Sequence, residues 1–336
     1  MMTSWQKIRT AHLEKRPIYL YGMGNGADKI LDILAETGMS VSGVFASDDF
    51  VRGQAYKGFR VQKYSDIAHL NPLIIIAFGT SLPEVMQRIF DLSKRHEVIM
   101  PDIPVTGTEL FDDDYFIKNQ AEINAAKNLF SDENSKRLFE DIINFKLTGD
   151  INYFSDAGGC SFADIFKSLP LTDNEIYADC GAYTGDTVKI FSETVKGYKR
   201  IDAYEPSEKT FKKLVKNTAN MYDISLHNAA VWSEDGEAFI DGTNNRNSNI
   251  LSTGKQAIKT VKISPDATVI KLDVEGSEMQ ALSGIDFTKK PKIICAVYHK
   301  SEDIFAIPLY LKQFGYRFKL KRINCLPAWD IFLICE

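Results

Sequence analysis

Short apolar runs alternate with amphipathic stretches along most of the chain. The runs with the length of buried strands lie at 18–21, 41–46, 73–78, 176–178, 201–204, 269–272, 292–298 and 331–335. Residues with helical spacing follow several of these runs, for example at 187–191. Strands that alternate with helices predict parallel sheets with helices packed on them. We therefore expect an α/β protein built from doubly wound sheets.

A polar, helix-forming stretch separates two such units. Residues 119–149 predict one or two connecting helices, with Ser131 as an N-cap and Gly149 as a C-cap. The chain of 336 residues has room for two domains. The predicted division is an N-terminal domain at 1–118, a helical linker at 119–150 and a C-terminal domain at 151–336.

The composition narrows the class of protein. Forty Lys and Arg against forty-five Asp and Glu give a net charge of −5, which offers no support for nucleic acid as a partner. The longest apolar stretches are far shorter than the roughly 20 residues that span a bilayer, and the first residues lack the apolar core of a signal peptide. Five scattered cysteines without a CxxC pair favour free thiols. We expect a cytoplasmic protein without a membrane span.

The first glycine turn follows the run at 18–21. Gly22, Gly24 and Ala27 satisfy the pattern GxGxxA, in which glycines permit a tight turn and the close approach of a phosphate to a helix N-terminus. Asp48 and Asp49 end the next predicted strand, where a Rossmann fold places its ribose-binding acid. Two interpretations remain open. A nucleotide or nucleotide-sugar binds through Gly22 and Gly24, or the unit docks or forms a homo-oligomer with an empty cleft.

This N-terminal stretch carries a resemblance. After the GxGxxA turn and the segment "GVFASDD", Gly53, Tyr56, Gly58 and Val61 complete a further motif. The combination resembles the small Rossmann-like N-terminal domain of sugar acetyltransferases and other polysaccharide-tailoring enzymes. The resemblance implies a nucleotide-size cleft in a protein that modifies sugars.

A second glycine turn follows the run at 176–178. It reads "DCGAYTGDT" from Asp179, with Gly181 and Gly185 four residues apart, unlike a dinucleotide GxGxxG. Glu205 ends the next predicted strand, where an acid can accept hydrogen bonds from both ribose hydroxyls. No Lys or Arg lies between Asp179 and Val188 to hold a pyrophosphate. This pattern favours a single nucleoside with a cationic or zwitterionic tail, and S-adenosylmethionine fits that description.

Two further residues are expected at the same edge of the sheet. Asp273 ends the predicted strand at 269–272, and His299 ends the run at 292–298. Ligands of open α/β sheets bind outside the carboxyl ends of the strands. We therefore expect Asp179, Glu205, Asp273 and His299 to converge.

The roles of His299 and Asp273 stay open on the sequence. His299 is either the general base that removes the proton of an alcohol acceptor or a residue that bonds the backbone at a strand end. Two interpretations are open for the acids Asp273, Glu275 and Glu278. They bind a divalent metal, or they have roles that involve no metal. The plainer alternative, which we favour, has Asp273 accepting hydrogen bonds from the cofactor or from turn amides and Glu278 solvated, because no His joins the three acids in the sequence. No metal is therefore expected.

These motifs also carry a second resemblance. "ADCGAYTGDTV", "AYEPSEKTF", "TVIKLDVEGSEMQALSGI" and "YHKSEDIFAIPLYL" resemble the motifs of FkbM-type S-adenosylmethionine-dependent methyltransferases, from about residue 130 to the C-terminus. The resemblance implies a class I methyltransferase fold, with seven strands of which the last is antiparallel and with the terminal hairpin as strands six and seven. The cofactor contacts that it implies, together with the residues beside them in the same motifs, are Asp179, Gly181, Ala182, Tyr183, Gly185, Asp186, Glu205 and Asp273.

The expected activity is methyl transfer from S-adenosylmethionine to a hydroxyl of a small molecule, a sugar or a surface-glycan precursor. Two rivals remain. One is an oxidoreductase or isomerase that uses NAD or a nucleotide-sugar in the N-terminal cleft, and the other is a non-catalytic binding protein. The Asn- and Ser-rich stretch 241–256 is expected to be a surface loop, with a lid over the acceptor as an alternative.

Overall fold

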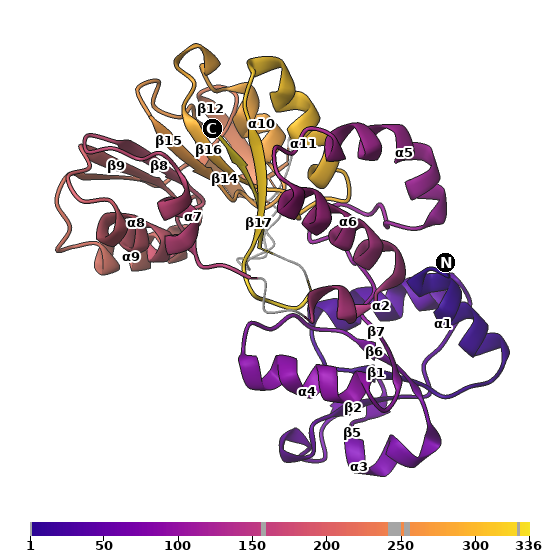
Figure 1. Ribbon diagram of the computed structural model, residues 1–336. Helices are drawn as coiled ribbons and strands as arrows, with labels where there is room; N and C mark the ends of the chain where they lie inside the picture. Colours follow the sequence, from indigo (N-terminus) through magenta and orange to yellow (C-terminus); the bar gives the residue numbers. More distant parts are fainter. Residues whose placement is uncertain (1, 156–158, 241–249, 252–255, 328–329) are drawn as a thin grey trace.

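The computed structural model describes residues 2–155, 159–240, 250–251, 256–327 and 330–336. The elements form two main parallel or mostly parallel sheets, one in each half of the chain, that lie one above the other in Figure 1. The predicted loop at 241–256 falls largely outside the described residues.

The N-terminal sheet has five parallel strands in the order β5-β2-β1-β6-β7. These strands are β1 (Ile18–Tyr21), β2 (Gly43–Ala46), β5 (Gln62–Lys63), β6 (Leu73–Ile76) and β7 (Glu97–Ile99). A short hairpin of β3 (Ala55–Tyr56) and β4 (Phe59–Arg60) precedes β5. The order places β1 in the centre and confirms the doubly wound pattern that the apolar runs predict.

Helices cover both faces of this sheet. They are α1 (Ser4–Leu13), α2 (Asn25–Glu36), the short α3 (Tyr64–Ile67) and α4 (Pro83–Ser93). The buried side chains of α1 and α2 pack on one face, and those of α4 pack on the other. Pro83 stands in the first turn of α4, where its missing N–H costs nothing.

The C-terminal sheet has seven strands in the order β10-β9-β8-β15-β16-β18-β17. They are β8 (Ile176–Cys180), β9 (Arg200–Tyr204), β10 (Ile224–His227), β15 (Val269–Leu272), β16 (Lys292–Ala296), β17 (Phe318–Arg322) and β18 (Ile331–Cys335). Only β18 is antiparallel to its neighbours on both sides. The seven-stranded sheet with its last strand antiparallel is the fold that the motifs imply, and β17 and β18 are the predicted terminal hairpin.

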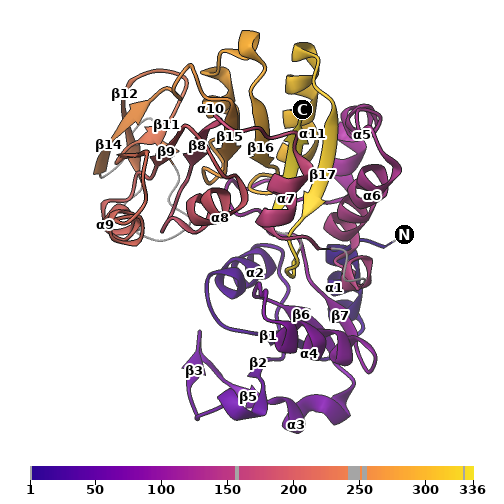
Figure 2. The ribbon, with the colours of Figure 1, turned by 60° about the vertical axis from the view of Figure 1, so that its left-hand side comes forward.

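Helices pack on both faces of the seven-stranded sheet as well (Figure 2). They are α7 (Phe162–Ser168), α8 (Asp186–Thr194), α9 (Glu208–Asn217), α10 (Glu278–Ser283) and α11 (Asp303–Leu311). A four-stranded sheet of β11 (Ala230–Val231), β12 (Gly236–Ile240), β13 (Ile250–Leu251) and β14 (Gln256–Val261) lies between β10 and β15 in the chain.

The stretch predicted as a linker contains two helices, α5 (Asp113–Lys127) and α6 (Glu133–Thr148). Gly149 ends α6 with φ of 65°, as predicted. The predicted N-cap was wrong: Asp132 caps α6 by accepting the N–H of Ser135, because the Ser131 hydroxyl instead donates to the carbonyl of Phe318 in β17. Helix α6 packs on β17 and α5 packs on α11, so both extend the cover of the C-terminal sheet.

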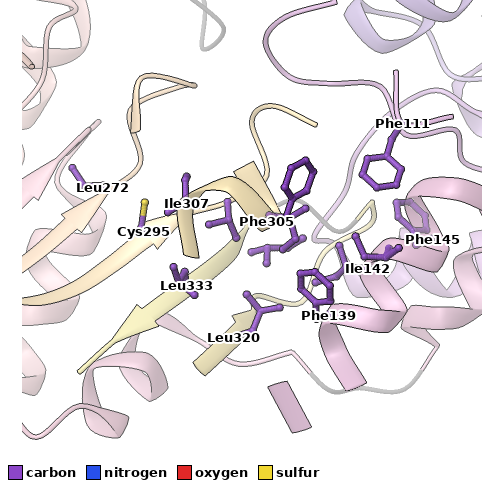
Figure 3. Packing of buried hydrophobic residues seen from close by; sticks show 14 of the residues in the cluster. Phe111, Phe139, Ile142, Phe145, Leu272, Cys295, Phe305, Ile307, Leu320 and Leu333 are labelled. Atoms are coloured by element: carbon purple, nitrogen blue, oxygen red, sulfur yellow. The ribbon is translucent and has the colours of Figure 1, made fainter. Parts of the chain in front are cut away.

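One hydrophobic cluster continues from the N-terminal sheet into the C-terminal one. Figure 3 shows the part that runs from Leu272 and Leu333 of the seven-stranded sheet, through Phe305 of α11, to Phe139 and Phe145 of α6. The continuous cluster ties the two sheets together through the helices between them.

Polar contacts also join the two halves of the chain. Thr80, after β6, forms an antiparallel bridge with Leu326 of the β17–β18 loop, with N···O distances of 2.6 and 2.9 Å. Lys146 of α6 forms a buried ion pair with Asp102, with a distance of 2.8 Å from Nζ to Oδ2. The N–H of Thr106, further along the same segment, donates to the carbonyl of His299 (3.0 Å). The segment after β7 therefore reaches the carboxyl end of β16.

Among the described residues, no helix is long and apolar enough to cross a membrane. The five cysteines are free thiols, and the fully buried Cys180 and Cys295 lie in β8 and β16, on either side of β15.

Candidate active site

Four neighbouring strands of the seven-stranded sheet bring the predicted site residues to one edge. Strands β9, β8, β15 and β16 lie side by side and run in the same direction. Glu205 follows β9 and Asp273 follows β15 directly, whereas Asp179 lies within β8. Strand β16 ends at Ala296, earlier than predicted, so His299 lies in the loop beyond it.

A buried ion pair connects β8 and β15. Lys271 and Asp179 are directly paired in the parallel register, and Lys271 Nζ lies 3.1 Å from Asp179 Oδ1. The same ammonium donates to the carbonyl of Gly181 (3.1 Å), and the hydroxyl of Thr187 donates to the other Asp179 oxygen. Burial alone would lower the pKa of Lys271, but Asp179 and Asp273 hold the pKa above its ordinary value. Asp179 has no exposed surface, so its carboxylate fixes the turn above it.

The glycine turn after β8 is packed against the turn after β15. Gly181 has φ of 80°, and a Cβ on it would lie 1.9 Å from the carbonyl oxygen of Asp273, so only glycine fits. Gly185, with φ of 89°, precedes α8, and Asp186 begins that helix with its side chain exposed. The two predicted cofactor contacts between Gly181 and Gly185 differ in solvent exposure. Ala182 is buried, and Tyr183 is 38 % exposed with φ of 48°.

Glu205 is buried beside this turn. Its Oε2 accepts the N–H of Tyr183 (3.1 Å), and its Oε1 accepts the N–H of Ser207 (2.9 Å). Burial raises the pKa of Glu205 to about 7, against the opposing effect of these two N–H groups. Each carboxylate oxygen retains a second lone pair, so the side chain can accept two further hydrogen bonds.

His299 and three carboxylates form the other half of the edge. His299 is 1 % exposed, and its Nδ1 lies 2.9 Å from Glu278 Oε1. Its Nε2 lies 3.5 Å from Asp273 Oδ1 and 3.6 Å from Glu275 Oε2. The hydroxyl of Tyr298 donates to Asp273 Oδ1 (3.1 Å).

Two expectations about this cluster were wrong. Glu278 is 1 % exposed and not solvated, because its Oε1 accepts the N–H groups of Val274 (2.9 Å) and Gly276 (3.4 Å) and is thereby held inside the β15–α10 turn. A histidine does join the acids, because the loop after β16 folds His299 back over that turn.

The charge of His299 follows from its neighbours. Burial alone would lower the pKa of His299, but Glu278, Asp273 and Glu275 raise this pKa to about 10. These carboxylates favour the protonated ring, which has no lone pair to accept a proton. The role of His299 as a general base stays a prediction.

The N-terminal glycine turn is filled by the chain's own side chains. Gly22 and Gly24 have φ of 112° and 141°, and a Cβ on Gly22 would lie 2.5 Å from the ring of Phe78. The N–H of Gly24 donates to the hydroxyl of Tyr56 (3.3 Å), which in turn donates to Asp28 Oδ1 (2.6 Å). The donor that a phosphate would use is thus engaged, which favours the structural interpretation of this turn.

A cavity of about 280 Å³ lies elsewhere in the N-terminal half. It opens beside the carboxyl ends of β1 and β2 and is lined by Tyr21, Ser47 and Asp49 and by Arg88 and Arg95 from the α4 side. Acidic and basic side chains both line the cavity, so the charge of its wall favours neither anionic nor cationic ligands. The chemistry-bearing residues lie at the C-terminal sheet, and we place the candidate site there.

Two functional residues escaped the sequence reasoning. Lys271 stands between apolar neighbours in a buried strand, and a buried lysine requires a carboxylate partner. A lysine in an apolar strand and an aspartate in the strand predicted to lie beside it would have been enough to predict this ion pair. Tyr298 offered no comparable signal, because its hydroxyl meets Asp273 only through the fold.

The comparisons with known proteins concern the family and the fold of the chain. Residues 179–318 match the family model described as the methyltransferase FkbM domain. A methyltransferase FkbM from Methylobacillus flagellatus KT has a similar structure over 100 % of this chain and 95 % of its own, with a TM-score of 0.75 and 17 % identity. The fold is a class I methyltransferase fold. The family match supports methyltransferase activity.

More distant structures are similar over 52 % of this chain. One is precorrin-6y C5,15-methyltransferase from Geobacter metallireducens GS-15, with 86 % of its chain covered, 13 % identity and a TM-score of 0.35. Another is Aeropyrum pernix fibrillarin with natively bound S-adenosyl-L-methionine, with 73 % covered, 11 % identity and a TM-score of 0.33. No curated protein matches the chain in sequence.

Removal of the buried cation tests the central ion pair. We expect Lys271→Met to lower the free energy of unfolding by about 3–5 kcal/mol, because Asp179 then stays buried without its partner. The double variant Asp179→Asn, Lys271→Met should be less destabilised than Lys271→Met alone. Chemical denaturation of the full chain followed by circular dichroism measures both.

The matched control is Lys212→Met, which breaks an exposed ion pair with Glu208 on α9 and should change the unfolding midpoint far less. A Lys271→Met variant as stable as the unmodified protein would contradict the assignment of the buried pair.

Proposed function

We propose that the protein transfers a methyl group from S-adenosylmethionine to a hydroxyl of an acceptor. The observation that carries the proposal is Glu205. It is a buried carboxylate at the end of β9, beside the glycine turn, and both of its oxygens retain hydrogen-bonding capacity. A ribose diol supplies two hydroxyl donors at the spacing of one carboxylate.

The charges around the turn support a cationic ligand in preference to a polyphosphate. The ammonium of Lys271 contacts the glycine turn at Gly181, but it is buried and paired with Asp179. The carboxylates of Glu205, Asp273 and Asp186 surround the same edge. A sulfonium with an ammonium tail is attracted by such a field, whereas a pyrophosphate is repelled.

The residues divide the reaction between two sides of the edge. We assign the donor side to Glu205, Tyr183 and the glycine turn, and the acceptor side to Asp273 and His299. S-adenosylmethionine supplies a methyl group on a positively charged sulfur. Residues that hold an acceptor oxygen in line with that methyl can contribute several kcal/mol, with about 7–11 as the upper range. The acceptor hydroxyl must also lose its proton. We assign the loss of this proton to the charged cluster of His299 and its three neighbouring carboxylates.

The acceptor class is proposed from the resemblance of the N-terminal stretch to domains of sugar-tailoring enzymes. We propose a hydroxyl on a sugar or surface-glycan precursor. Incubation with S-adenosylmethionine and a panel of sugars and nucleotide-sugars, read by a mass gain of one methyl group, tests this class. Methylation of amines or carboxylates in preference to hydroxyls would contradict it.

Replacement of Glu205 tests the donor side. We expect Glu205→Gln to bind S-adenosylmethionine at least about tenfold more weakly, because the amide offers one acceptor oxygen and carries no charge. Titration calorimetry measures the affinity. Glu193→Gln, on the exposed side of α8, is the matched control and should bind as the unmodified protein does. Unchanged affinity in Glu205→Gln would refute the ribose assignment.

The pKa of Glu205 gives the affinity a pH dependence. The ionised carboxylate accepts both diol hydrogen bonds, so ligand binding lowers the pKa from its value of about 7 in the free protein. Affinity should therefore be fully present above this pKa and be lost as the pH falls below it. We expect binding about tenfold weaker one unit below the pKa than one unit above it. A Glu205→Gln variant with the same pH profile would assign the dependence to another group.

Replacement of His299 tests the acceptor side separately. We expect His299→Ala to retain its affinity for S-adenosylmethionine and to lose turnover, because β8 and β15 separate the strand before His299 from the strand before Glu205. Calorimetry and a methyl-transfer assay measure the two properties. His69→Ala, an exposed histidine in the N-terminal half, is the control. A fully active His299→Ala variant would place acceptor activation elsewhere.

A further inference from the structure

The cluster around His299 combines burial with an excess of acidic groups. Asp273, Glu275 and Glu278 face the two nitrogens of one ring, at 3.5, 3.6 and 2.9 Å. Lys271, whose Nζ lies 3.9 Å from Asp273 Oδ2, is already bound to Asp179. Three carboxylates thus meet around one imidazole ring.

Two polar atoms in this cluster are buried without hydrogen-bond partners among the described residues. They are Nδ1 of His299 and Oε2 of Glu278. The 2.9 Å contact of Nδ1 with Glu278 Oε1 lacks hydrogen-bond geometry. A buried polar atom left unsatisfied costs about 1–3 kcal/mol. An imidazole nitrogen and a carboxylate oxygen that lie side by side are ligands that one metal ion can satisfy together.

The spacing of the groups fits a shared ion. Ligand atoms of Asp273, Glu278 and His299 all lie within 4.8 Å of one another. Ligands bound to one ion at metal–ligand distances of about 2.0–2.2 Å lie about 3.0–3.6 Å apart. The separations of the three groups are thus close to those that a shared ion requires. Glu275, 38 % exposed, stands at the open side of the cluster.

We propose that Asp273, Glu278 and His299 bind a divalent transition-metal ion that activates the acceptor hydroxyl. The imidazole ligand favours Mn²⁺ or Zn²⁺ over Mg²⁺ and Ca²⁺, which prefer sites made only of oxygen ligands. This assignment reverses the expectation that the site holds no metal. The role in catalysis rests on the proposed methyl transfer, whereas binding of the ion does not.

The step that the ion assists is balanced without an oxidant or reductant. An acceptor oxygen that coordinates the ion loses its proton more readily, because the positive charge stabilises the oxyanion. The proton leaves to solvent, the oxygen forms a bond to the methyl carbon, and the bond from carbon to sulfur breaks with its electron pair staying on sulfur. The products are the methyl ether and S-adenosylhomocysteine.

A ring nitrogen that binds a metal ion must be free of its proton. His299 therefore acts in this proposal as a neutral ligand and not as a base.

Titration of Mn²⁺ into the full-length protein, after treatment with a chelator, tests the proposal directly. Electron paramagnetic resonance detects free Mn²⁺, and binding removes its sharp signal. We expect a single ion per chain that Zn²⁺ displaces and an equal concentration of Mg²⁺ does not. We expect His299→Ala and Asp273→Asn to weaken binding by at least about tenfold. His69→Ala should bind as the unmodified protein does.

Calorimetry with S-adenosylmethionine on the same samples separates the two proposals. A chain that binds S-adenosylmethionine but no Mn²⁺ overturns the metal site and leaves the methyltransferase proposal intact. A chain that binds Mn²⁺ through His299 but no S-adenosylmethionine overturns the function and leaves the metal site. Equal Mn²⁺ affinity in His299→Ala and in the unmodified protein overturns the metal site even if every variant folds. Circular dichroism establishes folding for each variant.

Discussion

The buried ion pair between Asp179 and Lys271 is the interaction on which the active edge depends. It joins neighbouring strands at the centre of the seven-stranded sheet, and the same ammonium holds the carbonyl of Gly181. The glycine turn is thereby fixed so closely to the backbone of Asp273 that no side chain fits at Gly181. An ion pair in a dry interior is costly to form and more costly to break. Its presence at this point ties the donor side to the acceptor side.

The two sides carry different chemistry although they lie at one edge of the same sheet. Next to β9, burial raises the pKa of Glu205 and so disfavours its ionised form. Hydrogen bonds from hydroxyl donors would stabilise that ionised form. Beyond β16, His299 is a buried ring that faces three carboxylates. The central pair separates these two environments, so one edge can hold a sugar diol on one side and activate an oxygen on the other. The segment after β7 contacts the second environment through Thr106 and so links it to the N-terminal sheet.

Much of this arrangement could be predicted from the sequence, and the reason is periodicity. Apolar runs and glycine turns determine which residues form strands, and a parallel sheet brings the strand ends together, which was enough to place Glu205 and Asp273. Pairings across the sheet were not visible in the same way. Glu278 was predicted to be solvated because helix spacing does not reveal that the loop with His299 folds over it. Likewise, the pattern GxGxxA does not reveal that Phe78 and Tyr56 fill the N-terminal turn. The domain boundaries and the cofactor contacts stay predictions.

The most direct test of the account is a crystal structure of the full chain grown with S-adenosylhomocysteine. The account predicts the nucleoside beside the turn at Gly181, with both ribose hydroxyls on the carboxylate of Glu205 and the sulfur directed toward Asp273. Electron density for the ligand at the N-terminal turn near Gly22, or a ribose that makes no contact with Glu205, would contradict it.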